Sequence, residues 1–183
     1  MKELSLNILD ITENSVKAGA SLTEIRIEET ERELTLTIRD NGSGMSEEVV
    51  HAVRNPFYTT RTTRSVGLGI PLLSMAAEQT GGKLSITSHQ KTEADPTSGT
   101  QVTALFYKDH IDFTPLGDVI STLLTLIQGH PDRDFLFVHM REAADVTLDT
   151  RELREVLGDE VPLSTYEVLS WIRENLEEQY AQN

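Results

Sequence analysis

The sequence predicts an α+β fold, a two-layer α/β sandwich in which helices pack on one face of a mixed sheet. Two observations lead to this prediction. Residues 22–29 with 33–39, and 83–89 with 100–107, are two pairs of segments that alternate apolar and polar residues, as half-buried strands do. Helical patterns lie before, between and after these pairs, so helices and hairpins are segregated along the chain.

Glycine, proline and small polar residues mark the ends of the elements. Gly19 suits a left-handed C-terminal cap, Ser46 is typical of an N-cap, and Pro71 fits a first helical turn. The predicted order is helix 4–18, strands 22–29 and 33–39, helix 47–53, a mobile loop over 54–66, helix 70–80, and strands 83–89 and 100–107.

Residues 109–183 are predicted to form a small α/β C-terminal extension of a first domain, 1–108. Only Asp109–Pro115 could link the two parts, and its composition is not typical of a linker, so we expect the extension to pack on the first domain. Its predicted elements are helices 115–128, 150–157 and 164–179 and the paired strands 134–140 and 145–149.

Composition excludes several classes of protein. The chain has 183 residues and no cysteine, which rules out disulfides, thiolate metal sites and cysteine nucleophiles. It has no run of about 18 apolar residues and no signal-peptide pattern, so we expect a cytoplasmic protein without a membrane span.

The net charge of −14 is unevenly distributed. Residues 1–108 carry 14 acidic and 11 basic side chains, whereas residues 109–183 carry 16 acidic and 5 basic ones. This acidity argues against binding to nucleic acid. Two interpretations of the acidic extension stay open: it keeps the protein soluble, or it docks on a basic partner.

Three polar side chains share one stripe of the first helix. Asp10, Asn14 and Lys17 are spaced i, i+4 and i+7, about 120° from the apolar stripe. On its own, such a stripe is usually a solvated face. The alternative is a site for a polyanion and its metal, because an amide oxygen can bind Mg²⁺, an ammonium can contact phosphate and a carboxylate can act as a base.

Two glycine-rich segments are further candidates. Asp40 begins a turn that contains Gly42, Gly44 and Met45, where a carboxylate could accept a hydrogen bond from an exocyclic amine. A plain turn is the alternative. The second segment offers backbone amides to phosphate at the start of a helix. It comprises Gly67, Leu68 and Gly69, with Arg61 and Arg64 in the loop before it and Thr100 at the start of a later strand.

The order of these motifs resembles the GHKL family, whose ATP-binding domain, the Bergerat fold, is shared by gyrase, heat-shock chaperones, histidine kinases and mismatch-repair ATPases. ILDITENSVKAGAS resembles the N box, DNGSGM the first glycine box and NPFYTTR the F box. GLGIPLLSMAAEQTGGKLSITS resembles the second glycine box, and GTQVTALF the closing strand. The resemblance covers residues 4–108 and is closest to the histidine-kinase-like ATPase domain.

The resemblance implies ATP and Mg²⁺ as ligands and assigns roles to single residues. Asn14 would bind Mg²⁺, Asp40 would bind the adenine amino group, and Lys17 with Arg61 or Arg64 would contact phosphates. Gly42, Gly44, Gly67 and Gly69 would shape the pocket, with Met45, Leu68 and Thr100 beside the nucleotide. Asp10 stands where ATP-hydrolysing relatives carry Glu, so the resemblance leaves efficient hydrolysis in doubt.

A sensor kinase also needs a helical hairpin that bears a phosphoacceptor histidine, normally upstream of the N box. The N box here lies within the first residues, so we expect a stand-alone form that acts in trans. The five histidines are interpreted as ordinary surface or packed residues: His51, His89, His110, His130 and His139. Residues 109–183 resemble stand-alone kinase-type proteins found alongside iron-hydrogenase subunits, which implies a possible partner.

The leading functional hypothesis is a regulatory protein in signal transduction that binds Mg-ATP and acts as a protein kinase on a separate partner. Asp10 would be the base if the acceptor is a hydroxyl. The first alternative is an ATP-gated interaction module, similar to an anti-sigma switch, with slow or no turnover. The second alternative is a weak ATPase.

Overall fold

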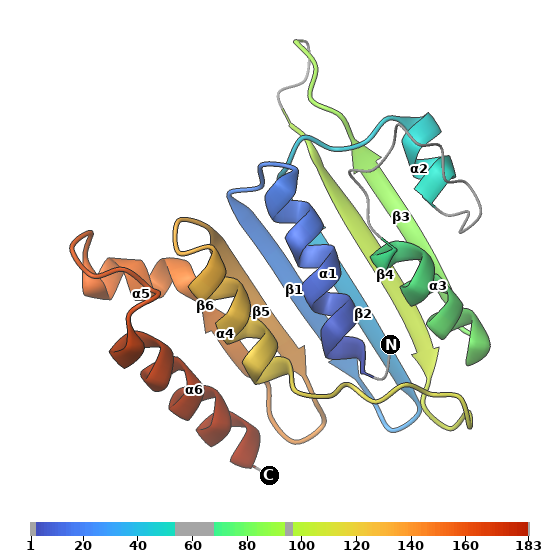
Figure 1. The fold of residues 1–183 in the computed structure, drawn as a ribbon. Coiled ribbons are helices and arrows are strands. Elements are labelled where there is room, and N and C mark those ends of the chain that lie inside the picture. Colours follow the sequence, from blue (N-terminus) through green and yellow to red (C-terminus); the bar gives the residue numbers. More distant parts are fainter. Residues whose placement is uncertain (1–2, 54–67, 94–96, 183) are drawn as a thin grey trace.

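The fold is built on one six-stranded mixed sheet, seen in a computed structural model that describes residues 3–53, 68–93 and 97–182. The strand order is β3-β4-β2-β1-β5-β6, and β1 with β5 is the parallel pair (Figure 1). The strands are β1 (Leu22–Glu29), β2 (Glu33–Asp40), β3 (Lys83–His89), β4 (Gly99–Tyr107), β5 (Asp134–Met140) and β6 (Val146–Asp149).

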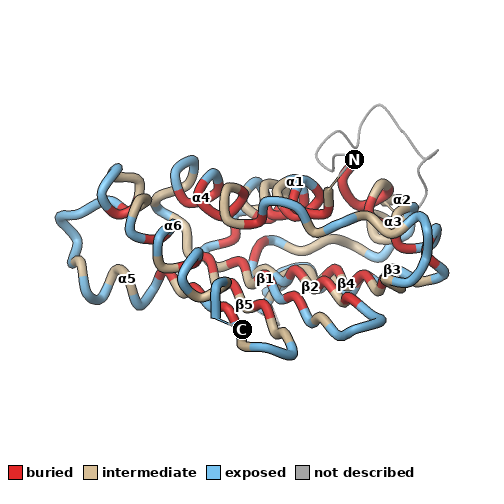
Figure 2. Tube along the Cα trace, turned by 90° about the horizontal axis from the view of Figure 1, so that it is seen from below, coloured by how far each residue is buried: buried red, intermediate tan, exposed pale blue. Residues whose placement is uncertain are grey.

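Helices form a second layer over one face of this sheet (Figure 2). Helices α1, α3 and α4 lie over the strands, while α5 and α6 lie beyond β6 (Figure 1). This arrangement confirms the predicted two-layer α+β sandwich. The helices are α1 (Leu4–Lys17), α2 (Glu47–Val53), α3 (Gly69–Gln79), α4 (Val119–Gly129), α5 (Thr150–Leu157) and α6 (Tyr166–Ala181). Within the described part of the chain, no helix is long and apolar enough to span a bilayer.

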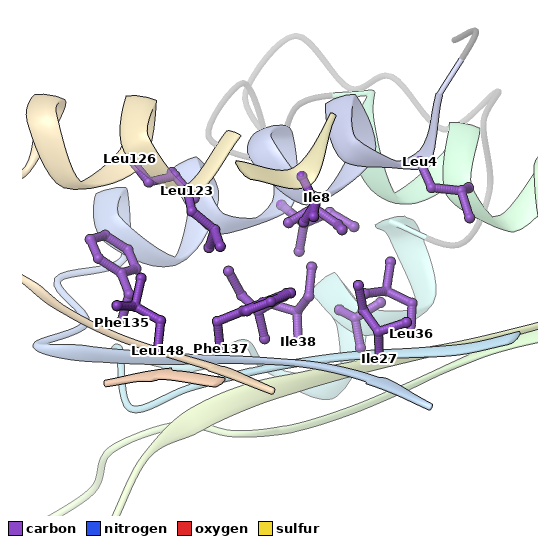
Figure 3. Close-up of a cluster of buried hydrophobic side chains, with 14 of the residues drawn as sticks. Leu4, Ile8, Ile27, Leu36, Ile38, Leu123, Leu126, Phe135, Phe137 and Leu148 are labelled. Atoms are coloured by element: carbon purple, nitrogen blue, oxygen red, sulfur yellow. The ribbon is translucent and has the colours of Figure 1, made fainter. Parts of the chain in front are cut away.

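A single apolar core lies between the two layers (Figure 3). Leu4 and Ile8 of α1 are fully buried, as are Phe135 and Phe137 of β5. The core therefore draws on both sides of residue 108. The division of the chain into two domains at that residue stays a prediction, since β5 continues the sheet by pairing with β1.

Helix α4 begins at Val119, four residues later than the start at 115 that the sequence predicts, so that start was wrong. The carbonyl groups of Pro115 and Leu116 accept hydrogen bonds from the backbone N–H groups of Leu4 and Ser5 at 2.9 and 2.8 Å. This segment thus satisfies two of the free donors at the start of α1 and cannot itself be helical.

The N-cap of α4 is Asp118, whose side chain accepts a hydrogen bond from the backbone N–H of Ser121 at 2.9 Å. This hydrogen bond lowers the pKa of Asp118, because it favours the charged carboxylate. Gly117, with φ of +77°, turns the chain immediately before the cap.

A buried histidine joins the last helix to the sheet. His139 of β5 is 2% exposed, and its ring nitrogens lie 2.9 Å from Tyr180 Oη and 2.9 Å from Glu29 Oε2. Burial lowers the pKa of His139 and raises the pKa of the Tyr180 hydroxyl. The His139 ring therefore links β1, β5 and α6 through one hydrogen-bonded chain.

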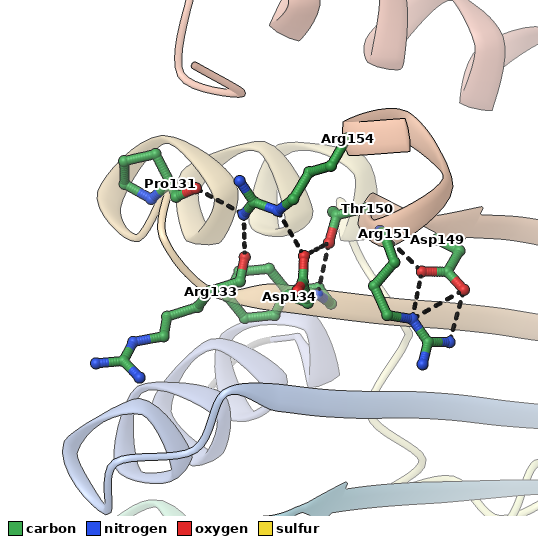
Figure 4. Close-up of polar contacts among 8 residues, drawn as sticks. Pro131, Arg133, Asp134, Asp149, Thr150, Arg151 and Arg154 are labelled. Atoms are coloured by element: carbon green, nitrogen blue, oxygen red, sulfur yellow. Dashed lines mark hydrogen bonds and ion pairs between the residues drawn. The ribbon is translucent and has the colours of Figure 1, made fainter. Parts of the chain in front are cut away.

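The start of β5 is fixed to α5 by a second polar cluster (Figure 4). Arg154 donates to Asp134 Oδ1 at 2.8 Å and to the carbonyl oxygens of Pro131 and Arg133 at 2.6 and 2.9 Å. Thr150 donates to the same Asp134 oxygen at 2.9 Å. Because Arg154 bonds three acceptors, α5 and the turn before β5 are held as one unit.

Candidate functional site

Asp40 is the last residue of β2, and its carboxylate is held from three directions. Ser15 Oγ of α1 donates to Oδ2 at 2.7 Å. The backbone N–H of Gly42 donates to Oδ1 at 2.9 Å, and the backbone N–H of Thr100 lies 3.3 Å from the same oxygen. A carboxylate oxygen can accept more than one hydrogen bond, so Asp40 keeps acceptor capacity for a ligand.

Beside Asp40 lies a cavity of about 230 Å³. It brings together Asn14, Lys17 and Asp40, which lie up to 26 positions apart in the sequence. Apolar side chains form most of the remaining lining: Ile11, Ala18, Ile38, Met45, Ile70 and Val102. Ser43, Gly44 and Thr100 complete it with Ser15. Apolar walls around a few convergent polar groups are typical of a small-molecule site.

Asn14 and Lys17 reach this cavity from the last turns of α1. Among the described residues, neither side chain has a hydrogen-bond or ion-pair partner. Asn14 is half-buried and Lys17 is exposed. An amide oxygen and an ammonium group are thus available to a ligand at the cavity, which favours the functional interpretation of this helical stripe over a merely solvated face.

The first glycine turn packs against α1 and β3. Gly44 has φ of +70°, and a Cβ at this position would overlap the carbonyl oxygen of His89. The backbone N–H of Met45 donates to Ser88 Oγ at 2.7 Å. This position therefore requires glycine for both its conformation and its close approach to β3.

The second glycine segment lies next to Asp10. A Cβ on Gly69, the first residue of α3, would lie 3.1 Å from the Cβ of Asp10 and 3.7 Å from its Oδ2. Asp10 does not line the cavity, and neither do Gly42, Leu68 and Gly69, although Ile70 does. The carboxylate of Asp10 lies where it interacts favourably with the N-terminal end of the α3 dipole.

Three predicted site residues, Arg61, Arg64 and Gly67, lie outside the described residues, as does the loop over 54–66. Thr100 is placed beside the cavity, but the hydrogen bond that reaches Asp40 comes from its backbone. The Thr100 hydroxyl lies 2.8 Å from Ser88 Oγ.

Sequence reasoning missed two serines of this site. Ser15 lies on the buried, apolar side of α1, yet its hydroxyl orients Asp40. Ser88 lies at the end of β3 and contacts both Met45 and Thr100. Ser15 could have been identified from the sequence because it is a polar residue within an otherwise apolar, buried stripe. Ser88 only continues the alternation of a strand, so the sequence contains no signal for its role.

Comparison with known proteins shows which protein family the chain matches. A family model described as histidine kinase-, DNA gyrase B-, and HSP90-like ATPase matches residues 2–110. The chain belongs to this ATPase family. Membership supports ATP binding, and it agrees with the resemblance found in the sequence motifs.

Relatives of this ATPase-family chain include two bacterial sensor proteins. The C4-dicarboxylate transport sensor protein of Pseudomonas aeruginosa is 40% identical over 57 residues, which are 31% of this chain and 9% of that protein. The tetrathionate sensor histidine kinase of Salmonella typhimurium is 31% identical over 103 residues, 56% of this chain and 17% of that one. The chain thus spans less than a fifth of the length of these relatives.

The fold of this family member is also similar to a solved structure, the ATPase domain of Aquifex aeolicus MutL complexed with ADP. The TM-score is 0.53 at 13% sequence identity, and the match covers 95% of this chain and 88% of the other. At this identity the likeness concerns the fold alone.

The residues at the cavity fit an adenine nucleotide with Mg²⁺. The apolar walls suit a base, and Asp40 supplies the fixed acceptor that an exocyclic amine needs. Within the described ranges, no group of three or more His, Cys, Asp or Glu side chains could hold a metal ion alone. Asn14 would therefore hold Mg²⁺ only together with oxygens of the nucleotide.

Proposed function

We propose that this chain binds Mg-ATP in the 230 Å³ cavity and acts as a protein kinase on a separate partner. The observation that supports the proposal best is the meeting of Asp40 with Asn14 and Lys17, which have no partners among the described side chains. Asp40 would bind the adenine amino group, Asn14 would hold Mg²⁺ and Lys17 would contact phosphate. The similarity to sensor histidine kinases supports phosphoryl transfer.

In that reaction the nucleophile of the partner bonds to the γ-phosphorus while ADP leaves. Asp10 is proposed as the base for a hydroxyl acceptor, and Arg61 or Arg64 as further phosphate contacts. Gly67, Gly69, Leu68, Gly42, Gly44, Met45 and Thr100 are proposed to shape the pocket. A cytoplasmic location, a role in signal transduction and the link with iron-hydrogenase subunits stay predictions.

One observation favours the second candidate, an ATP-gated interaction module with slow turnover. Among the described residues, the cavity lining includes no carboxylate other than Asp40, since Asp10 packs beside Gly69, and this arrangement favours slow turnover. In this case ATP would change the surface that the protein presents to a partner without being consumed quickly.

Incubation with γ-labelled ATP, alone and with candidate partner proteins, separates these functions. We expect label on the partner protein, with little free phosphate released by the chain alone. Substitution of Asp10 by Asn should lower transfer to a hydroxyl acceptor by about 100-fold, as loss of a general base does. Glu13→Gln, one helical turn away, is the matched control.

Label on no protein, together with tight nucleotide binding, would contradict the kinase proposal and favour the gated module. Release of free phosphate that disappears in Asp10→Asn would instead indicate an ATPase. These outcomes leave the binding site itself unaffected, because binding is measured separately by calorimetry.

Loss of the amide at position 14 should remove the metal dependence of binding. For the wild-type chain, we expect Mg²⁺ to raise ATP affinity by about tenfold or more, an increase worth ~1.4 kcal/mol. In Asn14→Ala that increase should vanish, whereas Asn14→Asp should retain it because a carboxylate oxygen also binds Mg²⁺. Isothermal calorimetry with and without Mg²⁺ measures the difference; an unchanged metal effect in Asn14→Ala would exclude Asn14 as the ligand.

A further inference from the structure

A second hollow lies far from the nucleotide cavity, between the outer strands and the last two helices. It has a volume of about 430 Å³. Leu136 and Val138 of β5 contribute to its lining, as do Leu153 of α5 and Trp171 of α6. We call this hollow the outer groove. Polar side chains complete its lining, among them Asp149, Asn175 and Gln179, so it is a partly apolar groove on the acidic extension that the proposed function does not use.

Trp171 is unusually exposed for its type. Its relative exposure is 51%, whereas its neighbours on the other side of α6, Ile172 and Leu176, are fully buried. Exposure of apolar indole surface to water is unfavourable, and a bound apolar side chain would remove that surface from water. Tryptophan is also the best aromatic partner for a cation, and it is enriched where proteins bind one another.

Carboxylates lie in the groove lining and on the side of this indole that faces away from the groove. Glu152 lines the outer groove, and at 100° per residue Glu167, Glu174 and Glu178 lie within about 60° of Trp171 on α6. Among the described side chains, none of these four has an ion-pair partner. The nearby Arg151 is already neutralised, because it pairs with Asp149 at 2.7 Å (Figure 4). These carboxylates in and beside the groove therefore favour a cationic occupant.

Strand β6 is the edge of the sheet, and its backbone groups at Thr147 already have hydrogen-bond partners, which limits how a partner protein can bind. The side-chain amide of Gln179 accepts from the backbone N–H of Thr147 at 2.8 Å and donates to its carbonyl oxygen at 3.0 Å. These are the two groups that an added strand would need at that position of β6. A partner must therefore insert side chains into the outer groove.

We infer that the outer groove docks a segment of a partner protein in which an apolar side chain lies next to arginine or lysine. The apolar side chain would contact Leu136, Val138 and Leu153, and the cation would lie against Trp171 and the glutamates beside it. A second copy of this chain is a poor occupant, since each copy carries a net charge of −14. The inference does not depend on the proposed nucleotide chemistry.

Trp171 is the only tryptophan of the chain, so its fluorescence reports directly on the groove. The full chain is titrated with three synthetic peptides of equal length, rich in arginine and leucine, in arginine and serine, or in glutamate and leucine. We expect the arginine–leucine peptide to shift the Trp171 emission and to bind about tenfold tighter than the arginine–serine peptide. The glutamate–leucine peptide should not bind. Equal affinity of the two arginine peptides would overturn the inference, because it would indicate charge attraction alone.

Variants separate the groove from the rest of the acidic surface, with binding followed by the anisotropy of a labelled arginine–leucine peptide. Trp171→Ala should weaken binding about tenfold, whereas Tyr166→Ala, which removes an exposed aromatic from the opposite side of α6, should not.

The double variant Glu174→Gln/Glu178→Gln should also weaken peptide binding. Its control is Glu177→Gln, which removes a carboxylate that is paired with Arg173. Equal effects of groove and control variants would refute the outer groove as the docking site. ATP affinity should stay at the wild-type value in all four variants, so failure here is distinct from failure of the nucleotide site.

Discussion

Substitution of Asp40 by Asn is expected to lower ATP affinity by about 100-fold, since a hydrogen bond to a charged group contributes ~1.5–3 kcal/mol. Asn can keep its amide oxygen towards the backbone N–H groups of Gly42 and Thr100, the present donors to Oδ1. Its NH₂ group would then replace Oδ2, beside Ser15. The NH₂ group of Asn and the amino group of adenine are both donors and would face each other, so the change weakens nucleotide binding more than it weakens folding.

Asp40→Ala is the stronger change and the less specific one. It removes the acceptor that the N–H groups of Gly42 and Thr100 share, whereas Ser15 Oγ keeps the carbonyl oxygen of Ile11 as an acceptor at 3.3 Å; each donor left unpaired costs about 1–3 kcal/mol. We expect no measurable ATP binding, together with lower stability. Calorimetry with Mg-ATP, paired with urea unfolding, measures both quantities.

A matched control for Asp40 is Asp118→Asn, which alters the N-cap of α4 outside the cavity. It should cost about 1 kcal/mol of stability or less and leave ATP affinity unchanged. If Asp40→Asn and Asp40→Ala both bound ATP like the wild-type chain, the nucleotide would have to lie elsewhere in the molecule.

Substitution of Gly44 by Ala is expected to have the largest effect on folding. The backbone there has φ of +70°, which costs an L-residue about 1–2 kcal/mol. The new Cβ would also overlap the backbone oxygen of His89, which cannot rotate away as a side chain could. We expect a loss of about 3 kcal/mol or more in the free energy of unfolding, and loss of ATP binding because the turn must shift.

Gly19→Ala separates the two causes. Gly19 has a similar φ of +79°, but beyond its chain neighbours no atom lies within 4 Å of the place that a Cβ would take there. This variant should cost only about 1 kcal/mol. Urea unfolding of both variants gives the comparison, and equal losses would show that overlap with His89 contributes nothing.

Local patterns were sufficient for most elements of the fold. The alternation in β1 and β2 and the helical period of α1 come from side chains that face one core, so each pattern is visible within its own segment. The start of α4 was misplaced because the carbonyl groups of Pro115 and Leu116 cap α1, more than 110 residues earlier in the chain. A contact at that separation leaves no periodic signal.

The sequence by itself determined the alternating strands, the helices, the two glycine turns and the residue types that an ATP site needs. Only the tertiary structure decided that Asn14, Lys17 and Asp40 share a cavity while Asp10 packs at Gly69, and that Trp171 lines the outer groove. The physical reason is that periodicity records which side of an element is buried. The distance between two elements depends instead on how the whole sheet and its helices pack, which no single segment contains.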